Sequence, residues 1–115
     1  MSAHPLFLGI DIGTTTVKAS LVDIAGTLIA DASLGHPTRF VRPSWVEQEP
    51  EDWWRTTVEV LRLLGQRAGT DAIAAIAGIG VSSQAPALVP LDEKGRSSGP
   101  ALIWMDRRAA PSPSA

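Results

Sequence analysis

The chain has 115 residues, a net charge of −2 and no cysteine. Its length allows one domain with a modest hydrophobic core. The small negative charge argues against a nucleic-acid partner, and the absence of cysteine excludes a disulfide framework and thiolate metal sites. No apolar segment approaches the length of a membrane span, and the N-terminus lacks the basic region of a signal peptide. These features predict a cytoplasmic protein that does not act at a membrane.

The first 35 residues have the pattern of three antiparallel strands joined by short turns. The run "LFLGID", residues 6–11, is almost entirely apolar, which predicts a strand buried on both faces. In "VKASLVD", residues 17–23, apolar and polar residues alternate, which predicts a strand with one apolar face. The sequence "DIAG", residues 23–26, favours a type I turn closed by a left-handed glycine. Residues 27–34, "TLIADASL", are then the returning strand.

A single long helix is predicted in the middle of the chain. Residues 35–50 precede it; they contain three prolines and little periodicity, which indicates a loop. We expect the helix from Glu51 to Ala68, because Pro50 suits a first helical position and Gly69 a C-terminal stop. Its predicted apolar stripe consists of Trp54, Val58, Leu61, Leu64 and Ala68.

The last third of the chain is expected to return to strands. Residues 71–75 favour a short helical turn, and residues 76–82 a second buried strand whose glycines allow close approach. The sequence "DEKG", residues 92–95, repeats the earlier turn, and "PALIWMD", residues 100–106, would be the strand that returns from it. Residues 110–115 are rich in Pro and Ser, which predicts disorder.

This order of elements predicts an α/β fold with a mixed sheet in residues 1–109.

The stretch "GIDIGTTTVK", residues 9–18, carries more polar groups than a plain hairpin needs. Gly9 and Gly13 allow positive φ angles and close backbone approach. The backbone N–H groups and hydroxyls of residues 14–16 could form a nest for phosphate oxygens. Asp11 could hold Mg²⁺ through water, and a carboxylate beside phosphate donors requires a cation between them. The stretch therefore predicts a metal–nucleotide site; the alternative is a hairpin whose Asp and Thr side chains satisfy its own backbone.

Two other phosphate motifs are excluded by the same stretch. A P-loop has four residues between its glycines and then Gly-Lys-Ser/Thr, which the stretch does not supply. The dinucleotide fingerprint needs a helix after its glycines, whereas a strand pattern follows here.

Five segments in order resemble the N-terminal part of the FGGY family of carbohydrate kinases, which includes xylulokinases and glycerol kinases. They are "GIDIGTTTVK", "SWVEQEPEDWW", "IAGIGVSSQ", "LVPLDEKGR" and "PALIWMDRRA". The resemblance runs from Leu6 to Ala109. It implies the actin-like, ribonuclease-H-like ATPase fold, present as an incomplete N-terminal domain. It also implies Mg²⁺-dependent transfer of the ATP γ-phosphoryl group to a sugar or polyol hydroxyl, with a xylulose-like pentulose as the first expectation.

The resemblance also implies roles for individual residues. Asp11 would organise Mg²⁺. The phosphates of ATP would be contacted by Gly13, Thr14, Thr15 and Thr16 and by Lys18, for which the alternative is a solvated strand lysine. The sugar pocket would be bordered by Gln84, Trp104 and Asp106. For Trp104 the alternative is a core residue of its strand, and for Asp106 it is a salt bridge to Arg107 or Arg108.

The sequence departs from the family pattern in two respects. After the glutamine, Ala85 and Pro86 replace residues with hydrogen-bonding heads, which leaves the preferred sugar open. The family's catalytic aspartate and adenosine pocket have no counterpart here, and nothing places Asp106 in the role of base. The ending "PSPSA" is typical of a truncated or frame-shifted gene product, or of a partial gene model.

We therefore expect little or no kinase activity from the chain alone. The alternatives are a non-catalytic Mg–nucleotide-binding module of the same fold and a relative of actin-like filament proteins. An unpaired sheet edge and an uncovered apolar face would favour homo-oligomers or aggregation.

Overall fold

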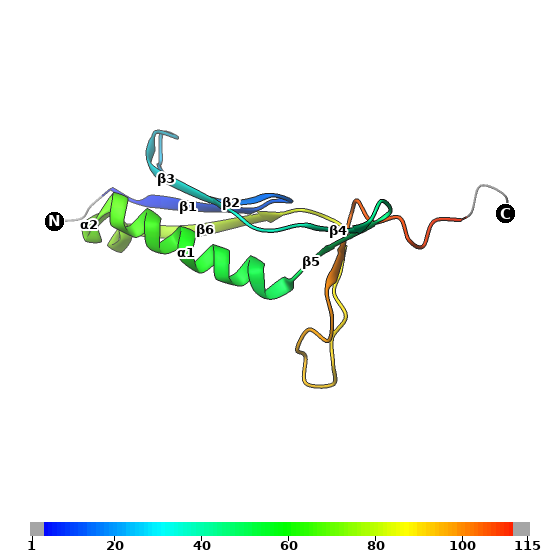
Figure 1. Ribbon diagram of the computed structural model, residues 1–115. Helices are drawn as coiled ribbons and strands as arrows, with labels where there is room; N and C mark the ends of the chain where they lie inside the picture. The colour runs from blue at the N-terminus through cyan, green and yellow to red at the C-terminus, as the bar shows by residue number, and fades with distance from the viewer. Residues whose placement is uncertain (1–3, 112–115) are drawn as a thin grey trace.

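The computed structural model describes residues 4–111 (Figure 1). In chain order its elements are β1 (Leu6–Ile12), β2 (Thr16–Asp23), β3 (Leu28–Gly35), β4 (Arg39–Arg42), β5 (Trp45–Gln48), α1 (Pro50–Ala68), α2 (Thr70–Ala74), β6 (Ile76–Ser83), β7 (Ala87–Leu88) and β8 (Ala101–Ile103). Of the tail that the sequence predicts to be disordered, residues 112–115 lie outside the described residues. The molecule is elongated, with extents of 67 × 31 × 19 Å. None of the described helices is long and apolar enough to cross a membrane.

The first sheet has the strand order β3-β2-β1-β6. The pairs β1–β2 and β2–β3 are antiparallel, and β1–β6 is parallel, so the predicted mixed sheet is confirmed. The turn between β2 and β3 also has the predicted form. Gly26 has a φ of +84°, and the Asp23 side chain accepts the N–H groups of Ala25 and Thr27 at 2.9 Å. These local bonds explain why the sequence alone identifies this turn.

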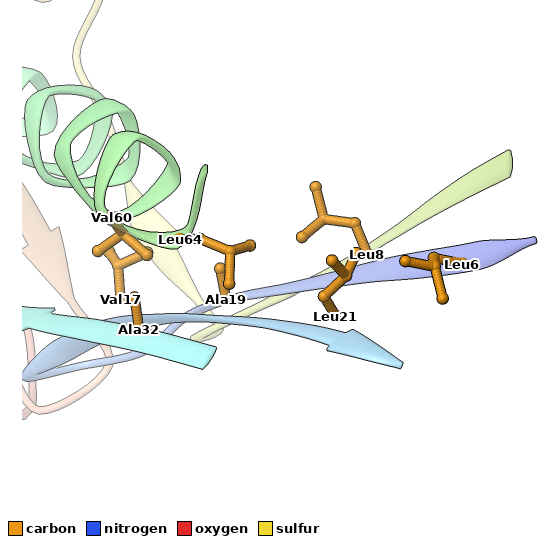
Figure 2. Close-up of a cluster of buried hydrophobic side chains, with 8 residues drawn as sticks. All are labelled: Leu6, Leu8, Val17, Ala19, Leu21, Ala32, Val60 and Leu64. Atoms are coloured by element: carbon orange, nitrogen blue, oxygen red, sulfur yellow. The ribbon is translucent and has the colours of Figure 1, made fainter. Parts of the chain in front are cut away.

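Helix α1 covers one face of the first sheet and makes the main core (Figure 2). The alternation in β2 places Val17, Ala19 and Leu21 on this face, and none of the three is exposed. Val60 and Leu64 of α1 pack on the same cluster. Pro50 is at the start of the helix, as predicted, and the N–H of Gly69 closes its end on the Gly65 carbonyl.

Three expectations about burial are wrong. Strand β1 is buried only on the helix side, since Gly9 and Asp11 are exposed. Strand β6 is the outer strand, and Ile79 is 64% exposed. The buried face of α1 is rotated relative to the predicted apolar stripe, because Trp54 is 68% exposed whereas Val60, outside that stripe, is buried. The first has its reason in the position of Gly9 and Asp11 on the face opposite α1. The other two arise because α1 packs mainly on β2 and β3 and leaves the outer strand β6 largely uncovered.

A second sheet, with the order β4-β5-β8-β7, contains residues predicted to form a loop. β4 and β5 form a hairpin, and β5 pairs with β8 through Glu47–Leu102 and Gln48–Ala101. The strands have only two to four residues, too few to show a period in the sequence. The predicted returning strand is confirmed at β8, but it belongs to this second sheet.

The segment between β7 and β8 contains the second predicted turn. Gly95 has a φ of +78°, and the Asp92 side chain accepts the N–H groups of Lys94 and Arg96. This turn has the same bonds as the one at Asp23, so the predicted similarity is confirmed.

Candidate functional site

The turn between β1 and β2 is held through its carbonyl groups. The Gly13 N–H donates to the Thr16 carbonyl at 2.9 Å. The backbone N–H of His36 donates to the Thr15 carbonyl at 3.0 Å, and its ring Nε2 donates to the Gly13 carbonyl at 2.8 Å. A Cβ at position 13 would lie 3.0 Å from the Thr16 oxygen, which is too close. Space, rather than the positive φ that the sequence suggested, is the reason for this glycine.

Gln48 of β5 connects this turn to three other segments. Its side chain is buried, with 1% of its surface exposed. Its Nε2 donates to the Thr14 carbonyl at 2.6 Å and to Thr38 Oγ1 at 2.7 Å. Its Oε1 accepts from Trp53 Nε1 and from Gln84 Nε2, both at 2.8 Å. These four bonds use the full hydrogen-bonding capacity of the amide, so Gln48 fixes the turn, the start of α1 and the end of β6 together.

The groups that remain available on this turn are donors. Among the hydrogen bonds of residues 4–111, none uses the backbone N–H of Thr14 or Thr15. None joins an Asp or Thr side chain of the stretch to the turn's own backbone, so the alternative of a self-satisfied hairpin is wrong. Backbone N–H groups held in place by bonds to the neighbouring carbonyls are suited to bind an anion.

Asp11 lies on the face of the first sheet that is opposite α1. Its Oδ1 accepts a hydrogen bond from Ser82 Oγ at 2.8 Å. Lys18 is its register partner on β2 and therefore shares the same face. Both line an open hollow of about 440 Å³, in which Gly9 and Gly80 leave the sheet surface bare. The hollow combines a carboxylate, an ammonium group and access to the backbone.

The donor set at Asp11 fits a hydrated Mg²⁺. Within residues 4–111 no three His, Cys, Asp or Glu side chains come together as a metal site. Mg²⁺ is nevertheless often bound by one or two carboxylates, with water and substrate phosphates as its other ligands. Asp11 is exposed and could supply that one carboxylate.

Trp104 and Gln84 reach the turn from two other segments. The Trp104 indole N–H donates to Thr14 Oγ1 at 2.8 Å, and the ring is 51% exposed. Trp104 follows β8, so the alternative of a strand core residue is wrong. The Gln84 backbone N–H extends the β1–β6 ladder by donating to the Ile12 carbonyl. Its side-chain Oε1 is buried and has no partner among the described residues, so a sugar hydroxyl would reach it only after a local movement.

Asp106 belongs to an ion-pair network rather than to the turn. Its carboxylate accepts from the Arg108 guanidinium at 2.8 Å and from the Val46 backbone N–H at 2.8 Å. The alternative of a salt bridge to Arg108 is therefore confirmed. These bonds, with that of Arg108 as the largest cause, lower the pKa of Asp106 to about 2.

Arg108 extends this network to the second sheet. Its guanidinium donates to the buried Glu47 at 2.8 Å, and both carboxylates raise the pKa of Arg108. Two guanidinium groups, those of Arg42 and Arg108, lie over the Trp45 ring at 4.5 and 4.3 Å from its centroid. The network thus joins the segment after β8 to the β4–β5 hairpin.

The structure brings together only part of the predicted site. Thr14, Gln84 and Trp104 meet around Gln48, and Asp11 and Lys18 share the hollow on the sheet. Asp106 instead forms a salt bridge with Arg108. Sequence reasoning missed Gln48, although it lies in the quoted segment "SWVEQEPEDWW". No local signal distinguishes it, because its four partners lie 5 to 36 residues away.

Comparison with known proteins identifies the same family as the sequence motifs do. Residues 6–113 match the family model "FGGY family of carbohydrate kinases, N-terminal domain". A glycerol kinase of Rhodospirillum centenum is 38% identical over 96% of this chain and 22% of its own length. A xylulose kinase of Klebsiella pneumoniae is 32% identical over 91% of this chain and 21% of its own length. The chain thus spans about a fifth of the length of these relatives.

Solved structures agree with this match. The xylulose kinase from Rhodospirillum rubrum superposes with a TM-score of 0.86 at 34% identity, over 91% of this chain and 21% of that one. A kinase from Brucella ovis gives a TM-score of 0.85 at 33% identity, over 90% and 22%. These neighbours confirm the expected actin-like ATPase fold.

Proposed function

This chain belongs to the FGGY family of carbohydrate kinases, and we propose that it forms the phosphate-binding part of an ATP-dependent sugar or polyol kinase. Enzymes of this family are phosphotransferases. In this proposal Gly13 and residues 14–16 contact the phosphates, and Asp11 holds Mg²⁺ through water. Lys18 adds positive charge beside them.

One observation carries the proposal: the carbonyls of the turn after β1 are bonded, whereas two of its N–H groups are available. Three neighbouring carbonyls are bonded by His36 and Gln48, whereas the N–H groups of Thr14 and Thr15 have no partner among residues 4–111. Phosphoryl transfer depends mainly on positioning and on neutralising charge. A preformed set of donors near a carboxylate that can hold a cation supplies both.

When bound, Mg²⁺ would neutralise phosphate charge next to Asp11. The residues of this chain would then orient the nucleotide, because Gln48 prevents the Thr14 carbonyl from turning toward the anion. The ammonium group of Lys18 lies on the same face and would attract the phosphates.

The substrate pocket is proposed near Trp104, whose half-exposed ring offers an apolar face to a sugar or polyol. Its bond to Thr14 would place that face beside the phosphate turn. Relatives include both glycerol and xylulose kinases. A pentulose such as xylulose remains our first choice, and Ala85 and Pro86 would leave its recognition to other groups.

We assign no catalytic base to this chain, because the pKa of Asp106 is lowered to about 2 by its bond to Arg108. A carboxylate so held is a poor acceptor for the proton of a sugar hydroxyl. This observation also favours the second candidate function, a non-catalytic Mg–nucleotide-binding module. Both candidates predict binding, and only the first predicts turnover once a base is supplied.

Calorimetry with ADP tests the binding, with and without Mg²⁺. We expect Mg²⁺-dependent binding by the wild type and loss of the Mg²⁺ dependence in Asp11→Ala. The matched control is Asp31→Ala, which removes an exposed carboxylate of β3 outside the hollow and should bind as the wild type does. No binding by the wild type, or equal binding by Asp11→Ala, would overturn the proposal.

A coupled ATPase assay with pentuloses and polyols tests whether the chain by itself transfers phosphate to a sugar. We expect no sugar-dependent turnover by the chain alone. Clear turnover would contradict the absence of a base and would exclude the non-catalytic module.

A further inference from the structure

His36 is a buried polar residue beside the turn between β1 and β2, and none of the sequence motifs includes it. It follows β3 and lies between the segments "GIDIGTTTVK" and "SWVEQEPEDWW", so the resemblance to the kinase family gives it no role. Its exposed fraction is only 8%. Buried polar groups are usually hydrogen-bonded, and the two bonds described for His36 both lead to this turn.

The backbone of His36 is restrained from both sides. Gly35, the residue before it, pairs with Thr16 at the end of the β2–β3 ladder. Pro37, the residue after it, disfavours a helical conformation at His36. The His36 N–H can therefore continue the ladder by donating to the Thr15 carbonyl at 3.0 Å, and the side chain is held in a fixed place beside the turn.

The side-chain bond of His36 defines the tautomer of its imidazole ring. Nε2 lies 2.8 Å from the Gly13 carbonyl oxygen, which can only accept a hydrogen bond, so Nε2 must carry the proton. Nδ1 is buried and has no partner among residues 4–111. Because an unpaired polar atom costs free energy on burial, an apolar side chain would serve packing alone better than this histidine does.

The bond to the Gly13 carbonyl also fixes the N–H group of the next residue. The peptide between Gly13 and Thr14 is trans, so its C=O and N–H lie in one plane and point in opposite directions. Since His36 binds the carbonyl, the Thr14 N–H is directed to the other side, where it has no partner among residues 4–111. Gln48 binds the Thr14 carbonyl and sets the Thr15 N–H in the same way. Each of the two available donors is thus fixed by one side chain.

Gly13 makes such a restraint necessary. A glycine has no Cβ to restrict its ψ angle, so the peptide after it rotates more easily than others. Rotation of this peptide would exchange the directions of the Gly13 carbonyl and the Thr14 N–H, and a carbonyl oxygen would then face an incoming phosphate. A larger residue is opposed by space, because a Cβ at position 13 would lie 3.0 Å from the Thr16 carbonyl oxygen. The turn therefore keeps its glycine and takes its rigidity from His36.

We propose that His36 is a positioning residue for phosphate binding: its Nε2–H holds the Gly13 carbonyl so that the Thr14 N–H faces a phosphate oxygen of the nucleotide. This inference rests on the proposed function and adds to it the side chain that prepares this donor. His36 does not touch the phosphate, because its ring bonds to the opposite side of the same peptide. Its loss therefore lowers the affinity for phosphate without removing a phosphate ligand.

Two substitutions of equal length at position 36 test this role by calorimetry with Mg²⁺–ADP. Gln places an amide N–H as many bonds from Cβ as Nε2 is in histidine, and Met places a methyl group there. We expect His36→Met to weaken binding at least about fivefold, because one donor of the turn is no longer fixed. His36→Gln should bind within about twofold of the wild type, because the donor is restored. His4→Met, at the exposed second histidine, is the matched control and should bind as the wild type does.

NMR of the protein without nucleotide separates positioning from general stability. The backbone N–H signal of Thr14 should shift in His36→Met and return toward its wild-type position in His36→Gln. The N–H signal of Thr15 should change little, because Gln48 fixes it. A residue that only stabilises the fold would disturb both signals alike. Circular dichroism checks that each variant is folded, and His36→Phe, which keeps a ring without the N–H, replaces His36→Met if the latter unfolds.

The possible outcomes distinguish this inference from the proposed function. A wild type that does not bind Mg²⁺–ADP would overturn the proposed function and the role of His36 with it. If the wild type binds and the folded variant without the donor binds equally well, the role of His36 alone is refuted. Equal weakening in His36→Met and His36→Gln would refute it too, because the N–H donor would then not be the property that matters.

Discussion

In the first sheet, Val17, Ala19 and Leu21 are fully buried against Val60 and Leu64 of α1. In the second sheet, the buried side chains include the polar residues Glu47 and Gln48 beside Val46, and each is bonded to partners from distant segments. The first region is held by apolar packing and the second largely by hydrogen bonds and ion pairs.

The difference has a consequence for function. Apolar packing tolerates small changes of position, whereas a hydrogen bond requires defined distances and angles. The turn that we propose for phosphate lies where the two regions meet, bonded to Gln48 on one side and continuous with β1 and β2 on the other. Its fold thus depends on the first region and its exact geometry on the second.

Loss of packing in the first region should have the largest effect on stability. Leu64 is 1% exposed and contacts the main cluster, so Leu64→Ala should lower the free energy of unfolding by about 2–5 kcal/mol. Urea denaturation followed by circular dichroism measures the change. Ile24→Ala, at an exposed position, should change it by less than about 0.5 kcal/mol. Equal effects of the two substitutions would mean that the core of the first sheet is not packed as described.

The same contrast explains what the sequence could predict. In β2 the alternation of apolar and polar residues is a local signal, and it correctly places Val17, Ala19 and Leu21 on the core face. The Asp23 and Asp92 turns were also predictable, because their bonds lie within four residues. Elements that depend on near neighbours in the chain were thus the ones the sequence identified.

The second sheet and the candidate site depended on distant partners. β5 pairs with β8, more than 50 residues later in the chain, and Gln48 bonds to Gln84. Nothing in residues 35–50 indicates these partners, and the prolines there favour a loop. The resemblance to the FGGY family predicted Asp11, Thr14 and Trp104 as site residues, but only the structure shows how Gln48 connects the turn to its surroundings.

Substitution of Gln48 should have the second largest effect on stability, and it tests the hydrogen bonds that hold the second region. Gln48→Leu replaces the amide with an apolar side chain of similar size and leaves the Trp53 indole, the Gln84 amide and the Thr14 carbonyl without their partner. Unpaired buried polar groups predict a loss of about 1–3 kcal/mol in the free energy of unfolding. Gln66→Leu, at an exposed position of α1, is the control and should have little effect.

NMR distinguishes a local effect at Gln48 from general destabilisation. The indole N–H signals of Trp53 and Trp104 should shift in Gln48→Leu, the second because Thr14 moves. Methyl signals of Leu21 in the first core should stay in place. Shifts throughout both regions would show that the network does not act separately from the core.

The smallest expected effect is confined to acid pH and concerns Asp106. Because its folded pKa is lowered from 3.8 to about 2, chiefly by Arg108, the charged carboxylate stabilises the fold above about pH 4. This contribution should decrease as the pH falls from about 4 toward 2, where the carboxyl group gains a proton and its bonds to Arg108 weaken. Stability measured by urea denaturation should therefore fall over this range in the wild type.

Asp106→Asn isolates this contribution from those of the other acidic groups. The variant has no charge to lose at position 106, so it should be less stable than the wild type at pH 6 and approach it toward pH 2. Asp71→Asn, at an exposed position of α2, should instead differ in stability from the wild type by the same amount at every pH. A constant difference between Asp106→Asn and the wild type across this range would mean that the charge on Asp106 does not hold the segment after β8 to the hairpin. The second region would then be stabilised by Glu47, Gln48 and apolar contacts alone.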